Sequence, residues 1–233
     1  MTGEEIDRLV DRARGEGRKS LTEPEVKGIL AARSVPVPKH RLVTGPVEAA
    51  EAASEMGYPL VLKVVSGDIL HKTEFGGVIT GLNTKEEVES AFSEIVMNVG
   101  DKDPSAAVEG FLLEEMVGRG VEVIVGSLRD EQFGPAVMFG IGGVAVELMK
   151  DVSFRLAPVE KEEALEMMRE VKGYPLLTGF RGSEPVDTDA VADVIVKVSR
   201  IIDDTEGIKE LEINPLMVLH KGAVALDARA VVE

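Results

Sequence analysis

A chain of 233 residues that is 44% hydrophobic can bury a substantial core, so one large domain or two small ones are expected. Its 42 acidic and 26 basic residues give a net charge of −16, which argues against a nucleic-acid backbone or an anionic membrane as partner. The absence of cysteine excludes disulfides, thiolate catalysis and a zinc–thiolate site. The charged N-terminus lacks a signal-peptide pattern, and the longest apolar run, Pro135 to Val146, is too short to span a membrane, so a cytoplasmic protein is expected.

The first part of the chain predicts an α/β lobe preceded by a helix. Within the first 20 residues an amphipathic helix is expected, with one apolar stripe made of Ile6, Leu9, Val10 and Ala13. A second helix is expected over Leu21 to Val35, where Thr22 and Glu25 form a capping box. The next expected elements are a strand at Arg41 to Val43, a helix at Pro46 to Met56, strands at Pro59 to Val65 and Gly77 to Leu82, and a helix capped by Thr84 and Glu87.

The second part predicts an α+β lobe with an antiparallel sheet. Its expected elements are strands at Phe111 to Met116, Val121 to Leu128, Ala136 to Phe139 and Val144 to Met149, helices at Glu160 to Val171 and Thr188 to Asp203, and a final hairpin. The polar stretch Gly100 to Ser105 is a plausible boundary between the lobes. The expected organisation is therefore an N-terminal helix over 1–20, a first lobe over 21–109 and a second lobe over 110–233.

The final hairpin predicts a cluster of three oxygen-bearing side chains, Glu212, Asn214 and Asp227, which we call the oxygen cluster. Strand side chains alternate between faces, so Glu212 and Asn214 point away from the core together. Two carboxylates this close would repel, and a hard divalent cation relieves that repulsion with oxygen ligands. Mg²⁺ carrying a nucleotide is the natural candidate. The alternative is a hairpin face that is simply solvated.

The pairing within this hairpin depends on its turn. A two-residue turn at Lys221–Gly222 would pair Leu216 with Asp227 and Asn214 with Arg229. Asp227 would then lie diagonal to Asn214 on the same face of the hairpin.

Lys63 and the following glycines predict a phosphate site. Lys63 is the single charge in the apolar run Pro59 to Val65, so it either lies on an edge strand or meets an anion. The loop after it contains Lys72 and closes with Gly76 and Gly77, whose backbone N–H groups can approach an anion closely. A phosphate is one such anion, although a glycine pair also serves many ordinary turns.

His71 lies in the middle of the same loop, beside Lys72. A neutral imidazole in a phosphate-binding loop can act as the nucleophile toward a phosphoryl group. The alternative is a solvated loop histidine without a chemical role.

The segment from Gly110 to Gly126 joins the two expected lobes. Its backbone over Glu115, Met116 and Val117 could hydrogen-bond an adenine, and Glu122 on the next strand could reach a ribose. Acidic residues on strands are otherwise ordinarily solvent-facing.

Together these segments resemble the ATP-grasp fold, and more closely the β subunits of ADP-forming acetyl-CoA synthetases, which are relatives of succinyl-CoA synthetase β. The resemblance covers nearly the whole chain through EPEVKGIL, YPLVLKVVS, ILHKTEFGGV, EVIVGSLRDEQFGPAVMFGIGGVAVELMKDVSFRLAP, LEINPL and ALDAR. It implies a two-lobed fold, α/β to α+β in character, with the nucleotide between the lobes.

The resemblance also implies residue roles. The oxygen cluster would bind Mg²⁺, Lys63 would contact the phosphates of ADP or ATP, and Glu115 to Val117 would hold the adenine. His71 would relay a phosphoryl group between the nucleotide and a histidine of a partner α subunit. That subunit would bind CoA and handle the acyl phosphate, in an α₂β₂ assembly.

The implied reaction is acyl-CoA + ADP + phosphate ⇌ carboxylate + CoA + ATP, in which Mg²⁺, Lys63 and the glycine loop hold the β-phosphate of ADP in line with phospho-His71. Two other functions stay open at this point. One is a free-standing ATP-grasp carboxylate ligase, and the other is a non-catalytic subunit that senses nucleotide.

Overall fold

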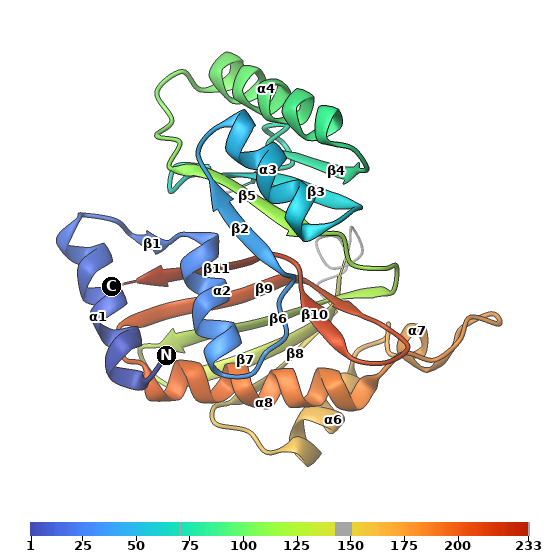
Figure 1. Ribbon diagram of the computed structural model, residues 1–233. Helices are drawn as coiled ribbons and strands as arrows, with labels where there is room; N and C mark the ends of the chain where they lie inside the picture. The colour runs from blue at the N-terminus through green and yellow to red at the C-terminus, as the bar shows by residue number, and fades with distance from the viewer. Residues whose placement is uncertain (70, 143–150, 233) are drawn as a thin grey trace. The chain divides into compact units, whose positions relative to one another are not determined.

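The computed structural model describes residues 1–69, 71–142 and 151–232. The chain forms two compact units (Figure 1). Unit 1 consists of Met1–Val37 and Gly118–Glu233, and unit 2 consists of Pro38–Val117. The expected strand at Val144 to Met149 lies outside the described residues.

These boundaries differ from the expected ones. Helix α1 (Gly3–Gly15) is not a separate N-terminal element, because its apolar stripe is buried in the core of unit 1. Strand β1 (Ser20–Leu21) pairs with β11 (Ala228–Val232), so the start of the expected first lobe also belongs to unit 1. In the other direction, β5 (Gly110–Glu115) was expected in the second lobe but pairs within unit 2. Pairings between distant parts of the chain set both boundaries, and local sequence patterns do not reveal them.

Unit 1 is built on an antiparallel sheet of the order β1-β11-β9-β6-β7-β8, with β10 paired to β9. The strands not yet bounded are β6 (Val121–Asp130), β7 (Gly134–Ile141), β8 (Val152–Leu156), β9 (Ile208–Val218) and β10 (Ala223–Ala225). The expected antiparallel sheet in this part of the chain is confirmed.

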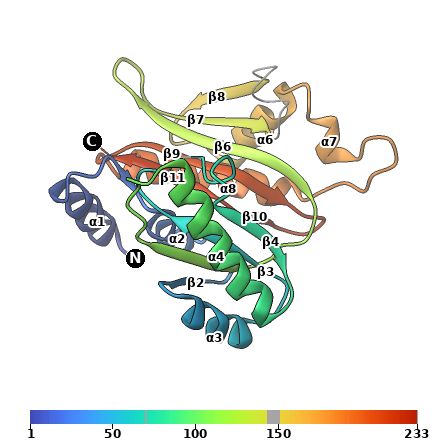
Figure 2. The ribbon, with the colours of Figure 1, turned by 90° about the horizontal axis from the view of Figure 1, so that it is seen from above.

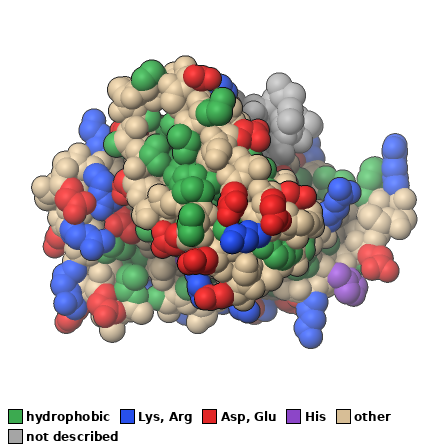
Figure 3. Space-filling view, turned by 45° about the horizontal axis from the view of Figure 1, so that its top comes forward, with side chains coloured by type: hydrophobic (Ala, Val, Ile, Leu, Met, Phe, Trp, Pro, Cys, Tyr) green, Lys and Arg blue, Asp and Glu red, His purple; other side chains and the backbone are tan. Residues whose placement is uncertain are grey.

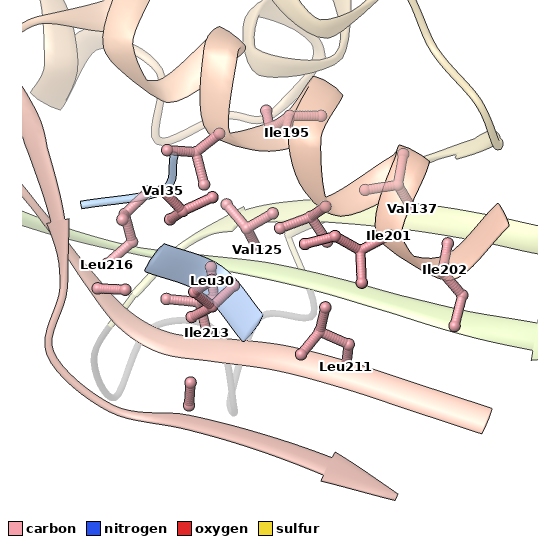
Figure 4. Close-up of a cluster of buried hydrophobic side chains, with 14 of the residues drawn as sticks. Leu30, Val35, Val125, Val137, Ile195, Ile201, Ile202, Leu211, Ile213 and Leu216 are labelled. Atoms are coloured by element: carbon pink, nitrogen blue, oxygen red, sulfur yellow. The ribbon is translucent and has the colours of Figure 1, made fainter. Parts of the chain in front are cut away.

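Helices supply the apolar layer of unit 1. They are α1, α2 (Glu23–Ala32), α6 (Lys161–Glu170), α7 (Pro175–Thr178) and α8 (Thr188–Asp204). Helix α8 begins where the Asp187 carboxylate accepts a hydrogen bond from the Ala190 N–H, and its buried stripe faces the sheet. Figure 4 shows Ile195, Ile201 and Ile202 of α8 against Val125, Leu211 and Ile213 of the strands, with Leu30 of α2 beside them.

Unit 2 is a smaller sheet with two helices. Its strands are β2 (His40–Val43), β3 (Leu60–Val65), β4 (Val78–Leu82) and β5, in the order β2-β5-β3-β4, all antiparallel. Helices α3 (Pro46–Met56) and α4 (Lys85–Lys102) pack on each other and on the strands, as both views show (Figures 1 and 2). The predicted cap of α4 is confirmed, because Thr84 Oγ1 accepts from the Glu87 N–H at 3.1 Å.

The capping box of Thr22 and Glu25 is confirmed at the start of α2. The helix is shorter than the predicted Leu21 to Val35, because Leu21 belongs to β1 and Ser34 adopts a positive φ of 61° after the last turn.

Among the described residues, no helix is both long and apolar enough to cross a membrane. On the face drawn in Figure 3, acidic and basic side chains are interspersed.

Candidate functional site

The oxygen cluster forms on β9 and the segment that precedes β11. The Asn214 N–H donates to the Asp227 carbonyl at 3.0 Å, so Asp227 lies directly opposite Asn214. Arg229 pairs with Glu212. The predicted register, with Asp227 diagonal to Asn214 and Arg229 opposite Asn214, is therefore wrong by two residues. A shift of two keeps every side chain on its face, so the cluster survives the correction.

The turn explains this register. Val218 pairs with Ala223, and the Leu219 N–H donates to the Gly222 carbonyl at 3.0 Å, so the chain reverses at His220 and Lys221, one residue before the predicted turn. The Asp187 carboxylate accepts from the Gly222 N–H at 2.8 Å, which fixes this turn to the start of α8. The hydrogen bonds from Gly222 and Ala190 hold the pKa of Asp187 below its usual value.

Glu212 is held from two sides. Its Oε1 accepts from Asn214 Nδ2 at 3.2 Å, and its Oε2 lies 3.1 Å from the Arg229 guanidinium. The Glu212 side chain is 24% exposed, Asn214 is exposed and Asp227 is half-buried. Water or a small ligand can therefore reach the cluster.

The cluster fits a hard divalent cation by the chemistry of its donors. Two carboxylates and one amide supply oxygen ligands of the kind that Mg²⁺ takes. In the described part of the chain, no group of three or more His, Cys, Asp or Glu side chains could hold a metal, so the amide of Asn214 is needed to complete a set of three. Arg229 neutralises part of the negative charge on Glu212 in this state.

Lys63 meets a protein carboxylate. Its Nζ lies 2.8 Å from Glu114 Oε2, with the two side chains 8% and 3% exposed. The edge-strand alternative is wrong, because β3 lies between β5 and β4. Sequence reasoning missed Glu114, although its signal was a charge within the apolar strand FLLEE.

The glycine pair closes a tight turn. The N–H groups of Gly76 and Gly77 donate to the carbonyls of Thr73 and Lys72, at 3.0 and 2.8 Å, and Gly76 has a φ of +65°. A Cβ on Gly77 would lie 2.6 Å from a methyl carbon of Val64. Both N–H groups are used within the turn in this state, so an anion could take them only if the turn opened.

His71 begins this turn and is exposed, while Lys72 is half-buried. The His71 carbonyl accepts from the Glu74 and Phe75 N–H groups at 3.1 and 3.4 Å. Helix α4 holds the turn, because Asn98 Nδ2 donates to the Gly76 carbonyl at 3.1 Å. The backbone carbonyl of Gly77 in turn accepts from the Val64 N–H at 2.8 Å, which brings the turn next to Lys63.

Residues Glu115, Met116 and Val117 end unit 2, so the predicted connection between the two parts of the chain is confirmed. The N–H groups of Glu115 and Met116 donate to the carbonyls of Lys39 and Pro59 at 2.9 and 3.0 Å. Both are therefore already bonded within unit 2. Glu122 is the second residue of β6 in unit 1, is exposed, and pairs with Met217.

The candidate residues fall into two groups. Lys63, Lys72, His71 and the glycine pair lie together in unit 2, with Glu115 to Val117 at its end. Glu122 and the oxygen cluster lie in unit 1, on strands β6 and β9 and beside β11. Besides Glu114, sequence reasoning missed Arg229 as the partner of Glu212. The turn predicted at Lys221–Gly222 paired Arg229 with Asn214 instead.

Residues 12–232 match the family model of the ATP-grasp domain. The chain is 46% identical to the β subunit of acetate–CoA ligase (ADP-forming) I of Pyrococcus furiosus, over 96% of both chains. It is 47% identical to acetate–CoA ligase (ADP-forming) I of Archaeoglobus fulgidus, over 87% of this chain and 30% of that longer protein.

A solved structure of acetyl-coenzyme A synthetase 1 from Ca. Korarchaeum cryptofilum matches with a TM-score of 0.86 and 43% identity, over 98% of this chain and 100% of that one. That protein was solved with coenzyme A and Mg-AMPPCP, and with its phosphohistidine segment pointing towards the nucleotide-binding site.

Proposed function

Because the chain belongs to the ATP-grasp family and, within it, to the ADP-forming acetate–CoA ligase β subunits, we propose that it binds Mg·ADP and passes a phosphoryl group to it. The chain would act in the reaction acyl-CoA + ADP + phosphate ⇌ carboxylate + CoA + ATP. The observation that carries this proposal is the oxygen cluster of Glu212, Asn214 and Asp227, built in a chain that matches such a β subunit over 96% of its length.

Unit 1 would hold the cation of the nucleotide. Mg²⁺ neutralises phosphate charge and orients the phosphates when it is bound. Glu212 and Asp227 would supply carboxylate oxygens and Asn214 its amide oxygen. The Asn214 amide now donates to Glu212 through nitrogen, so it would have to turn over to present oxygen to a cation.

Unit 2 would hold the phosphates and the relay. Lys63 would offer its ammonium to a phosphate oxygen, in exchange for or together with Glu114. Lys72, Gly76 and Gly77 would line the phosphate side. Glu115, Met116 and Val117 would hold the adenine, and Glu122 of unit 1 the ribose.

His71 would be the catalytic residue. In the direction of ATP synthesis, the P–N bond of phospho-His71 breaks while a β-phosphate oxygen of ADP forms the new P–O bond. The imidazole leaves as the neutral ring. The exposure of His71 and the single turn that it begins support a segment that opens and carries the phosphoryl group.

A partner subunit would complete the reaction. The name of the Pyrococcus relative specifies a β subunit, and the Archaeoglobus relative contains the matched part within a longer chain. We propose an α partner that binds CoA and forms the acyl phosphate, in an α₂β₂ assembly. The acetyl group is the first acyl group to test.

The direct test is phosphohistidine formation in the purified complex with the α partner. With Mg²⁺ and γ-labelled ATP, the wild-type β chain should acquire an acid-labile label at His71, and His71→Ala should acquire none while binding Mg·ADP within about twofold. His220→Ala, which alters another exposed histidine at a turn, is the matched control and should label normally. If the wild-type chain binds nucleotide without ever being labelled, it is a nucleotide-sensing subunit and the relay is wrong.

A further inference from the structure

Lys27 is a completely buried lysine in α2. Its side chain has 0% exposure, and its ammonium lies 2.8 Å from Glu23 Oε1, one turn earlier on the helix. It also donates to the Leu226 carbonyl at 2.8 Å, across 199 positions of sequence. Burying a charge pair costs several kcal/mol, and apolar side chains of the same volume usually serve stability as well or better. Packing alone therefore does not account for this lysine.

The carbonyl that Lys27 binds lies in the short break between β10 and β11, next to Asp227. The neighbouring backbone groups in this break are also fixed. The Ala225 N–H donates to Pro36, the Leu226 N–H donates to Pro215, and the Asp227 carbonyl accepts from Asn214, at 2.9 to 3.0 Å. The Lys27 ammonium adds a side-chain hydrogen bond to this arrangement.

We propose that Lys27 is a positioning residue for the oxygen cluster. Its ammonium fixes the Leu226 carbonyl and thereby holds Asp227 opposite Asn214. Glu23 pairs with the ammonium inside the core at 2.8 Å, and α2 holds both residues in place through Val26, Ile29 and Leu30. This inference rests on the proposed function, since it assumes that Asp227 is a cation ligand.

The test uses the double variant Glu23→Gln/Lys27→Met in the full chain. Removing both charges leaves no buried charge unpaired and does not change the net charge, so the free energy of unfolding measured in urea should fall by only about 1–3 kcal/mol, the cost of the polar groups that lose Lys27. Mn²⁺ affinity at saturating ADP, read by electron paramagnetic resonance, should fall about 10- to 100-fold, the usual effect of losing a group that orients a metal ligand. Exchange of the Asn214 N–H with deuterium should quicken at least about tenfold, because its acceptor at Asp227 is no longer held.

The matched control is Arg18→Met/Glu25→Gln, which removes the ion pair between Arg18, before β1, and Glu25 of α2. It should leave Mn²⁺ affinity and Asn214 exchange unchanged. The Val232 N–H, bonded to Lys19 at 2.9 Å at the far end of β11, serves as an internal reference.

Two results would decide against the proposal, and a third separates it from the proposed function. Unchanged Mn²⁺ affinity together with unchanged Asn214 exchange in Glu23→Gln/Lys27→Met would overturn it. Equal acceleration at Asn214 and Val232 would also overturn it, because that result means general loosening. If wild type binds no Mn²⁺ with ADP, the cation site itself fails, and Asn214 exchange still decides separately whether Lys27 fixes the break.

Discussion

Lys63 and Glu114 form a buried ion pair, with Nζ 2.8 Å from Oε2, on the neighbouring strands β3 and β5. Glu114 lies diagonal to Lys63, because Val61 is its direct partner in the register. The ammonium proposed to contact phosphate therefore has a protein anion beside it before any nucleotide arrives. Glu114 holds Lys63 in place, and in the proposed function it competes with the phosphate for the ammonium.

Replacing Lys63 alone should destabilise unit 2. Lys63→Met leaves the Glu114 carboxylate buried without its ammonium, which costs about 3–5 kcal/mol of unfolding free energy. Lys63→Met/Glu114→Gln should recover most of that stability. It should still bind Mg·ADP at least about tenfold more weakly than wild type, because the positive charge that contacts the phosphates is lost. Urea unfolding and calorimetric titration measure the two effects separately. Recovery of both stability and affinity in the double variant would remove Lys63 from the nucleotide site.

Asp227→Asn should weaken magnesium-dependent ADP binding by about tenfold or more, because it removes one negative ligand while keeping the shape of the side chain. Calorimetric titration with ADP, with and without Mg²⁺, is the measurement. The weaker ADP binding that is measured without Mg²⁺ should be nearly the same in Asp227→Asn and in wild type. Asp130→Asn alters an acidic residue at the β6–β7 turn and is the control. Equal losses in the two variants would mean that charge, and not ligation, is being measured.

Gly77→Ala should destabilise the turn that carries His71. The new Cβ would lie 2.6 Å from Val64 Cγ1 and 3.1 Å from the Lys72 carbonyl, and such overpacking costs about 1–3 kcal/mol. Hydrogen exchange of the Gly77 and Gly76 N–H groups should quicken. Gly67→Ala is the control in the same loop, since its Cβ would meet only Glu109 Oε1 at 3.8 Å. Unchanged exchange in Gly77→Ala would show that the turn absorbs the methyl group.

Glu25 should make stability depend on pH in the acid range. Burial raises the pKa of Glu25, but hydrogen bonds from Arg18 and the Thr22 backbone lower it more, to a pKa of about 2 instead of 4.5. The carboxylate is thus favoured in the folded state, so its contribution is complete above about pH 4.5 and is lost as pH falls towards 2.

At pH 7, Glu25→Gln should lower the free energy of unfolding by about 3 kcal/mol. The difference in the free energy of unfolding between wild type and Glu25→Gln should decrease as the pH falls from about 4.5 to 2. Urea unfolding at pH 7, 4, 3 and 2 tests this. A gap that stays constant over that range would mean that Glu25 acts through shape and not through charge.

The sequence predicted what local rules control. The capping residues Thr22 and Thr84 correctly predicted the starts of two helices. The alternation of side chains along β9 correctly placed Glu212 and Asn214 on one face. What it could not predict depends on distant partners. The pairing of Ser20 with Val231 places the start of the expected first lobe in unit 1. The hydrogen bond from the Gly222 N–H to the Asp187 carboxylate holds the turn one residue earlier than predicted, and the position of this turn sets the register of Asp227. The sequence predicts that Lys63 either lies on an edge strand or meets an anion, and only the register of β3 on β5 shows that Glu114 is that anion.

The division of unit 1 into residues 1–37 and 118–233 sets the order in which the chain can fold during synthesis. Unit 2 is continuous, so all of its strand pairs can form once Val117 has left the ribosome. The first 37 residues emerge earlier but must wait, because β1 pairs with β11 and Lys27 binds Leu226, both near the end of the chain. Their apolar stripes stay uncovered during most of translation, and the oxygen cluster is among the last features to form.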